Sequence, residues 1–227
     1  LRNIAQIATP EGNCAQHGES MQELKLYKNA AVFIQNGRIT AVGPDDTISP
    51  GIITGNPGIE IIDAGGKCVI PGFVDPHTHF LFGGTRVEEF VDRLNGVPYL
   101  ELLQRGGGIC RTRKGTAEAS FAELYAQGKL FLKQMLQLGV TTAEGKSGYG
   151  LDLENECKLL AVIQQLQKDQ PISLVATYLG AHAIPPEYQD RADAYVDFMV
   201  DKVLPVIETQ QLAKFVDVFC ETGVFTL

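Results

Sequence analysis

Several features that mark other classes of protein are missing from this chain of 227 residues. Its five cysteines are odd in number and scattered, with no Cys-x-x-Cys pair, which argues against a disulfide framework and a thiolate zinc site. No apolar run is long enough to span a bilayer, and no signal peptide is visible. The formal net charge is −8, and no basic stripe with interleaved aromatic residues is present. We therefore expect a cytoplasmic protein with neither nucleic acid nor a membrane as its partner.

A phosphate-binding P-loop is missing as well. The run Gly145-Lys146-Ser147 matches the end of that motif, but the motif needs a glycine where this chain has Val140. What remains is an ordinary globular composition, with 44% hydrophobic and 20% charged residues. The length allows a sizeable core and one or two domains.

Residues 1–70 are expected to form β structure, because short apolar segments alternate there with turn residues. Two hairpins are predicted: 31–34 with 38–42 around Asn36-Gly37, and 59–62 with 67–70 around residues 63–66. The stretch 43–58, rich in Gly, Pro and Asp, is predicted to be a loop.

After residue 70 the pattern changes to strands that alternate with helices. Strands are predicted at 71–79, 140–144, 172–181 and 215–220. Helices are predicted at 98–105, 120–138, 152–167 and 190–203, with Gly106-Gly107-Gly108 as a flexible turn and Pro205 bending or ending the last helix. This alternation implies a parallel sheet with crossover helices.

Two histidines, His77 and His79, stand one residue apart at the end of the first predicted strand. Side chains alternate between faces along a strand, so both imidazoles are expected on one face and Thr78 on the other. Two imidazoles a few ångströms apart can share one metal ion. A bare His-x-His pair also occurs by chance, so this interpretation depends on the residues around it.

Polar residues follow each of the other predicted strands. The run Glu144–Gly150 follows the second strand, His182 the third and Glu221 the fourth. In a (β/α) barrel the carboxyl ends of the strands form the active-site face, so these groups are expected near the histidine pair. Taken alone, His182 fits a partly buried histidine bonded to backbone equally well. Beside a His-x-His site we interpret it as a substrate contact or as an electrophile for a developing oxyanion.

Arg86 lies in the predicted loop 82–86, after the histidine pair. A guanidinium in this place can bind a substrate carboxylate through two parallel hydrogen bonds. The alternative is a surface arginine paired with Glu88 or Glu89, and the loop taken alone favours that alternative.

The segment 71–79 resembles the metal-binding strand of the amidohydrolase superfamily, which reads Pro-Gly-Phe/Leu-Val/Ile-Asp-x-His-x-His. Further segments resemble the imidazolonepropionase family within it: 82–90, 106–109, 144–154, 180–182 and 217–221. The Lys-Ser-Gly-Tyr-Gly-Leu run at 146–151 is rather specific within the superfamily. The stretch 110–118 departs from the family pattern of a Thr-Val pair followed by a Thr-Arg pair.

The resemblance implies an α/β fold, a TIM-type (β/α)8 amidohydrolase barrel preceded by a small β-sandwich. Residues 1–70 would form an incomplete β-sandwich domain, and residues 71–227 the N-terminal half of the barrel with about the first four β/α units. A closed barrel needs eight strands and about 250 residues. We therefore expect a truncated or partly represented enzyme that is inactive alone. The remaining metal ligands, a His and an Asp, and the glutamate general base would lie beyond Leu227.

Carried over residue by residue, the resemblance implies two metal ligands, His77 and His79, and three substrate contacts, Arg86, Tyr149 and His182. Tyr99 is a further residue expected to line the pocket. The family binds one zinc or iron ion per site, and imidazole accepts both. Residues 219–222 contain no lysine that could bridge two metals, which also favours one ion. Relatives are commonly dimers, so a homodimer is a candidate assembly.

The implied activity is hydrolysis of the ring amide of 4-imidazolone-5-propanoate to N-formimidoyl-L-glutamate, a step in histidine breakdown. A metal-bound water ionises near neutral pH and the ion polarises the carbonyl, which suits a cyclic amide. One alternative is another cyclic-amide hydrolase or deaminase of the superfamily, against which the 146–150 run and Arg86 argue. The other is an inactive fragment that pairs with another chain or with itself.

Overall fold

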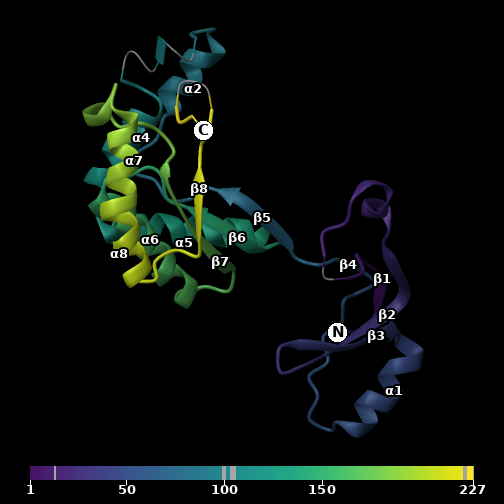
Figure 1. Cartoon of the computed structure of the whole chain (residues 1–227). Helices are drawn as coiled ribbons and strands as arrows, with labels where there is room; N and C mark the ends of the chain where they lie inside the picture. Colours follow the sequence, from purple (N-terminus) through teal and green to yellow (C-terminus); the bar gives the residue numbers. More distant parts are fainter. Residues whose placement is uncertain (13, 99–100, 103–105, 222–223, 227) are drawn as a thin grey trace. The chain divides into compact units, whose positions relative to one another are not determined.

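The computed structural model describes residues 1–12, 14–98, 101–102, 106–221 and 224–226, and the chain forms two compact units, Leu1–Pro71 and Gly72–Leu227 (Figure 1). The sheet of the first unit is built mainly on antiparallel pairing, and that of the second on parallel pairing. Among the described helices, none has both the length and the apolar character that a bilayer crossing requires.

The N-terminal unit holds one four-stranded sheet in the order β3-β2-β1-β4. Its elements are β1 (Ile4–Thr9), a 3-10 turn (Gly18–Gln22), β2 (Lys25–Gln35), β3 (Arg38–Pro44), α1 (Asp45–Gly55) and β4 (Cys68–Val69). The hairpin predicted at Asn36-Gly37 is confirmed, and it joins β2 to β3. Both turn residues have positive φ, 54° and 72°, as a two-residue hairpin turn of this kind requires. Four side chains form the small core: Ile4, Ile7, Ala30 and Val32.

Two predictions for this unit are wrong. Residues 45–55 form helix α1 rather than a loop. A distant residue stabilises the first turn of α1, because Arg2 Nε donates to Asp45 Oδ1 at 2.8 Å. A prediction from the local frequency of Gly and Pro cannot include that contact. The second hairpin does not form, because residues 59–62 are not a strand and Cys68–Val69 pairs in parallel with β1 instead. The assignment of this unit as an incomplete β-sandwich stays a prediction.

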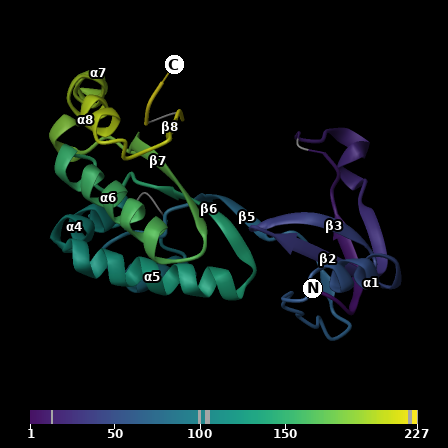
Figure 2. The same cartoon turned by 90° about the horizontal axis from the view of Figure 1, so that it is seen from below.

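The C-terminal unit is a parallel sheet in the order β5-β6-β7-β8, with helices between its strands. The strands are β5 (Phe73–Thr78), β6 (Val140–Lys146), β7 (Ser173–Ala181) and β8 (Phe215–Val218). The helices are α2 (Val87–Leu94), α4 (Ile109–Glu118), α5 (Phe121–Gln137), α6 (Leu153–Asp169), α7 (Ala192–Phe198) and α8 (Leu204–Thr209). Figure 2 shows α5 and α6 along the same side of the sheet. The four predicted strands and the helices predicted at 120–138 and 152–167 are confirmed.

The ends of α5 and α6 follow from their capping residues. Ser120 N donates to Glu123 Oε2 at 2.8 Å and Glu123 N donates to Ser120 Oγ at 3.3 Å, which is the predicted capping box. Asp152 Oδ1 accepts from Asn155 N at 2.8 Å and caps α6. The apolar faces of both helices pack on the sheet in one core, which includes Leu124, Leu132, Ala143, Leu159, Leu160, Ile163, Leu166 and Tyr178. This core fixes the strands whose ends carry the polar residues.

Three segments of this unit differ from expectation. Residues 110–118, the stretch that departs from the family pattern, lie in helix α4 and not in a loop, and α2 begins directly after Arg86. The helix predicted at 98–105 falls largely outside the described residues. Pro205 does not end the last helix, because a π-helical turn, Met199–Val203, precedes it and the chain continues as α8. Pro205 has no N–H to donate to the helix, and the wider π turn before it accommodates this missing hydrogen bond.

Candidate functional site

Three histidines and one tyrosine lie at the carboxyl edge of the parallel sheet. His77 and His79 lie at the end of β5, Tyr149 lies in the loop after β6, and His182 follows β7. Because β5, β6 and β7 run in the same direction, residues more than 100 positions apart reach one edge.

Three of these rings form one cluster. The His79 and His182 rings are stacked with centroids 4.6 Å apart. The Tyr149 ring lies 4.9 Å from His79 and 5.3 Å from His182. His77 is more exposed, and its ring centroid lies 6.0 Å from that of His79. His79 is therefore the residue that joins the His-x-His pair to Tyr149 and His182.

A cavity of about 360 Å³ lies beside the ring cluster. Its described lining includes His79, Phe82, Arg86, Phe90, Thr112 and Tyr149, but neither His77 nor His182. Apolar rings with a few polar groups of different kinds are typical of small-molecule sites. Thr112 comes from helix α4, so the stretch that departs from the family pattern contributes to this wall.

Arg86 fits both sequence interpretations at once. It lines the cavity, and its Nη1 lies 3.8 Å from Glu89 Oε2. That separation is longer than a hydrogen bond. The Glu89 carboxylate instead accepts the Gly108 amide, at 3.1 Å from each oxygen. The loose contact with Glu89 therefore does not close the guanidinium fork to a ligand.

Burial controls the protonation of the histidines. Burial is the main cause that lowers the pKa of His79 to about 3, and Coulomb interactions with His182, His77 and Lys146 act in the same direction. Burial also lowers the pKa of His182. Both rings are therefore neutral at pH 7, and the neutral imidazole is the form that binds a metal ion.

A backbone carbonyl fixes the tautomer of His182. The Nδ1 atom of His182 lies 2.9 Å from the carbonyl oxygen of Gly148, which can only accept. Nδ1 therefore carries the hydrogen, and Nε2 of the neutral ring is a hydrogen-bond acceptor. The role as donor to an oxyanion, expected from the sequence, would need the doubly protonated ring, which the lowered pKa disfavours.

One buried cation, Lys146, ties together the ends of three strands. Its side chain is 4% exposed, and Nζ donates to Glu144 Oε1 at 3.1 Å and to Asp217 Oδ2 at 2.7 Å. Thr177 Oγ1 donates to Glu144 Oε1 at 2.6 Å. Sequence reasoning missed this network. The available signal was the spacing of Glu144 and Lys146, which puts both on one face of β6.

The donors at this edge fit part of a metal site. Nδ1 of His79 is buried and has no hydrogen-bond partner among the described residues. The 6.0 Å between the two ring centroids leaves room for an ion with zinc–nitrogen bonds of about 2.0–2.1 Å. Within the described ranges no group of three or more His, Cys, Asp or Glu could hold a metal. His77 and His79 could therefore act as two ligands of an ion that needs further ligands.

Two further residues that the sequence places near the site are Glu221 and Tyr99. Glu221 follows β8 and is exposed, and its amide donates to the Phe225 carbonyl at 3.1 Å. Phe219, just before it, does reach the cluster, with its ring 6.4 Å from His182. Tyr99 lies outside the described residues.

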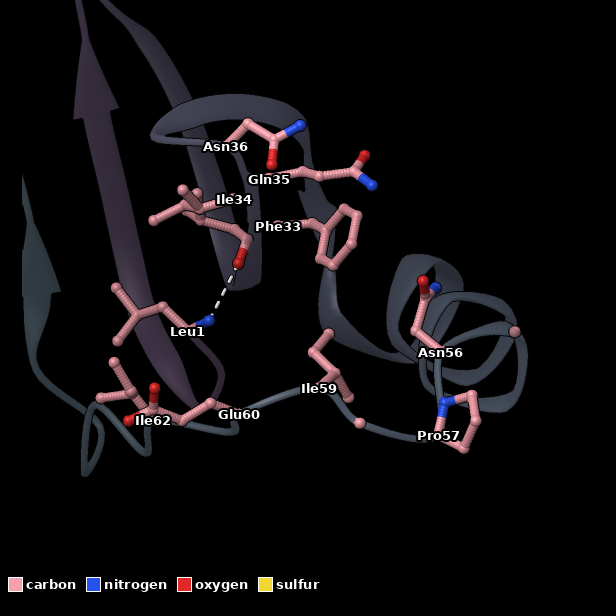
Figure 3. Close-up of a pocket in the computed structure, with 13 residues that line it drawn as sticks. Leu1, Phe33, Ile34, Gln35, Asn36, Asn56, Pro57, Ile59, Glu60 and Ile62 are labelled. Atoms are coloured by element: carbon pink, nitrogen blue, oxygen red, sulfur yellow. Dashed lines mark hydrogen bonds between the residues drawn. The ribbon is translucent and has the colours of Figure 1, made fainter.

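A larger cavity, of about 690 Å³, lies in the N-terminal unit (Figure 3). Figure 3 shows Phe33, Ile34, Ile59 and Ile62 around it, and the Leu1 nitrogen donates to the Val32 carbonyl at 2.9 Å. Among the described residues that line it, Glu60 has the one charged side chain, and none is a histidine. This cavity therefore has room for a ligand but no convergent reactive groups.

Comparison with known proteins finds relatives of the kind that the sequence motifs resemble. A model of the Amidohydrolase family matches residues 60–98. The imidazolonepropionase of Phocaeicola vulgatus is 47% identical over 225 residues, which are 98% of this chain and 53% of that protein. The imidazolonepropionase of Bacillus thuringiensis is 49% identical over 228 residues, 100% of this chain and 52% of that protein.

The chain is similar to imidazolonepropionases along its whole length, and part of it matches the Amidohydrolase family. Among solved structures, E. coli guanine deaminase matches with a TM-score of 0.56 at 17% identity, over 90% of this chain and 42% of that chain. At that identity the likeness shows the fold alone, and it confirms the predicted partial TIM-type barrel. The resemblance to imidazolonepropionases is confirmed along the chain. The chain spans about half the length of the curated relatives it matches.

Proposed function

We propose that this chain carries the N-terminal part of the active site of an imidazolonepropionase. That enzyme hydrolyses the ring amide of 4-imidazolone-5-propanoate to N-formimidoyl-L-glutamate. The observation that carries the proposal is the convergence of His79, Arg86 and Tyr149 on one cavity, with His182 stacked on His79. The names of relatives that are 47% and 49% identical support the same substrate.

His77 and His79 would hold one zinc or iron ion. When bound, the ion would supply a water that ionises near neutral pH and would polarise the amide carbonyl. The lowered pKa of His79 keeps that ring in the neutral form that a metal needs. The five free cysteines support a reducing, cytoplasmic location for the enzyme.

The chain's own side chains would bind and orient the substrate. Arg86 suits the propanoate carboxylate, because a guanidinium donates two parallel hydrogen bonds to a carboxylate. Tyr149 would place its hydroxyl on the tail or on the ring oxygen. Neutral His182, with Nδ1–H bonded to the Gly148 carbonyl, would accept a ring N–H of the imidazolone at Nε2. This acceptor role replaces the oxyanion role expected from the sequence.

The test is ligand binding followed by nuclear magnetic resonance (NMR) on the zinc-loaded chain. The probe is imidazole-4-propanoate, a stable analogue with the ring and tail of the substrate. We expect shifts at Arg86, Tyr149 and His182, and no comparable response to hydantoin, dihydroorotate or cytosine. Turnover of the imidazolone itself is followed in parallel by mass spectrometry. Equal responses to hydantoin, or shifts elsewhere in the chain only, would contradict the proposal.

A further inference from the structure

Glu156 is a charged residue on the buried face of α6. It is 1% exposed, and the positions around it on that face are apolar: Leu153, Leu159, Leu160 and Ile163. A carboxylate among such residues is costly unless polar groups satisfy it. Asp152 already caps the helix, so the N-terminus of α6 does not explain the placement of Glu156.

The polar groups that satisfy this carboxylate come from the loop after β6. Oε1 accepts from Gly148 N at 3.1 Å, from Gly150 N at 2.7 Å and from Leu151 N at 2.8 Å, and Oε2 accepts from Gly148 N at 3.0 Å. The Ser147 hydroxyl also bonds to the carboxylate, and its oxygen accepts the Leu179 amide at 3.1 Å. Burial raises the pKa of Glu156, and these hydrogen bonds oppose that rise.

The loop 147–151 has a shape that ordinary side chains do not favour. Gly148 has a φ of 103° and Leu151 a φ of 57°. A Cβ atom at Gly148 would lie 2.7 Å from the Leu179 carbonyl oxygen, and one at Gly150 would lie 2.5 Å from the Glu156 nitrogen. The loop therefore packs tightly between β7 and α6, and the Glu156 carboxylate binds the amides that this shape turns inward.

The same loop contains one residue of the candidate site, Tyr149, and bonds to another, His182. Tyr149 stands between Gly148 and Gly150, whose amides both bond to Glu156. The Gly148 carbonyl receives the Nδ1 hydrogen of His182. One peptide segment thus links the buried carboxylate to the Tyr149 ring and to the tautomer of His182.

We propose that Glu156 is a positioning residue for the active site. It fixes the loop 147–151, and through that loop it holds the Tyr149 ring against His79 and the His182 ring in the tautomer that presents Nε2 as an acceptor. The anchoring of the loop stands by itself, whereas its consequence for substrate binding rests on the proposed function.

The test compares three variants of the full chain by NMR. Glu156→Gln keeps the size of the side chain but places an amide nitrogen against inward-pointing N–H groups. Glu154→Gln is the matched control, because Glu154 is exposed on the same helix. Leu159→Ala removes a fully buried side chain of α6 and lowers global stability, but it keeps the Glu156 carboxylate that binds the loop amides. The measurements are amide exchange at 148, 150 and 151, nuclear Overhauser effects between Tyr149 and the two histidine rings, and the affinity for imidazole-4-propanoate.

We expect Glu156→Gln to speed exchange at the three loop amides by about tenfold or more, because each loses a charge-assisted hydrogen bond. The ring contacts of Tyr149 should weaken and analogue affinity should fall about tenfold, while exchange of the β7 amides other than Leu179, which bonds to Ser147, stays unchanged. Glu154→Gln should match the wild type, and Leu159→Ala should keep the ring contacts. Wild-type loop exchange in Glu156→Gln, or uniform changes like those of Leu159→Ala, would overturn the proposal. If no variant binds the analogue, the proposed function fails, and the exchange and ring contacts still decide the role of Glu156.

Discussion

A cavity of the N-terminal unit is larger than the cavity at the candidate site of the C-terminal unit, but it has fewer titratable side chains. The N-terminal cavity measures about 690 Å³ and is lined mainly by apolar and amide side chains, with Glu60 as its charged side chain among the described residues. The C-terminal cavity measures about 360 Å³, and it is lined by His79, Arg86 and Tyr149. The candidate site is therefore identified by titratable groups at the ends of parallel strands and not by cavity volume.

Metal binding should show the largest difference between the units. His79→Ala removes a buried imidazole with an unsatisfied Nδ1, and we expect zinc affinity to fall by about 100-fold or more. His17→Ala, at an exposed position of the N-terminal unit, should leave zinc affinity unchanged. Competition with a chromophoric chelator measures both. Equal losses in the two variants would break the comparison.

Ligand binding should separate the two cavities next. Arg86→Ala should weaken imidazole-4-propanoate by about 10- to 100-fold, because a hydrogen bond to a charged group contributes about 1.5–3 kcal/mol. Arg93→Ala, at an exposed position on helix α2, which begins directly after Arg86, and Glu60→Gln in the larger cavity should bind the analogue as the wild type does. Titration calorimetry measures all three. If Glu60→Gln lost as much affinity for the analogue as Arg86→Ala, the ligand would not be bound by the C-terminal cavity alone, which would contradict the proposal.

Backbone strain should distinguish Gly148, the residue before Tyr149 of the C-terminal lining, from a glycine of the N-terminal lining. Gly148→Ala places a Cβ atom 2.7 Å from the Leu179 carbonyl oxygen at a φ of 103°, so we expect the free energy of unfolding to fall by about 1–3 kcal/mol. Gly58→Ala, in the N-terminal cavity, meets no atom within 4 Å and should change stability by less than about 1 kcal/mol. Urea unfolding followed by circular dichroism measures both variants. A neutral Gly148→Ala would show that the loop is not fixed.

The last comparison concerns pH. The pKa of His79 is about 3 in the folded chain, below its ordinary value of 6.5. The unfolded state therefore binds more protons, and the stability of the metal-free chain should fall as the pH drops from about 6.5 toward 3. His79→Gln should flatten this dependence, and His17→Gln should preserve it. Urea unfolding at several pH values measures the slopes, and an unchanged slope in His79→Gln would contradict the burial of that ring.

The sequence predicted the C-terminal unit better than the N-terminal one, for a physical reason. The strands at 140–144 and 172–181 and the capped helices after Ser120 and Asp152 are encoded in local patterns of apolar and capping residues. Helix α1 and the pairing of β4 with β1 depend on distant partners, Arg2 and Gln6, which local patterns do not register.

The candidate site shows the same division. The His-x-His pair, Arg86, Tyr149 and His182 stand in motifs, and the structure brings His79, Tyr149 and His182 together. The roles assigned to these residues stay predictions. Glu156 was missed, although a charged residue on the apolar face of α6 is itself a signal. The tautomer of His182 depends on the Gly148 carbonyl and could not be predicted from the sequence.

The most direct test of the assignment is a zinc titration followed by the imidazole signals of the chain, which contains four histidines. We predict that the His77 and His79 signals shift together and stop shifting at one zinc ion per chain, while His17 does not move. Shifts of His17 equal to those of the pair, or no shift of His77 and His79, would contradict a metal site at the strand ends of the C-terminal unit.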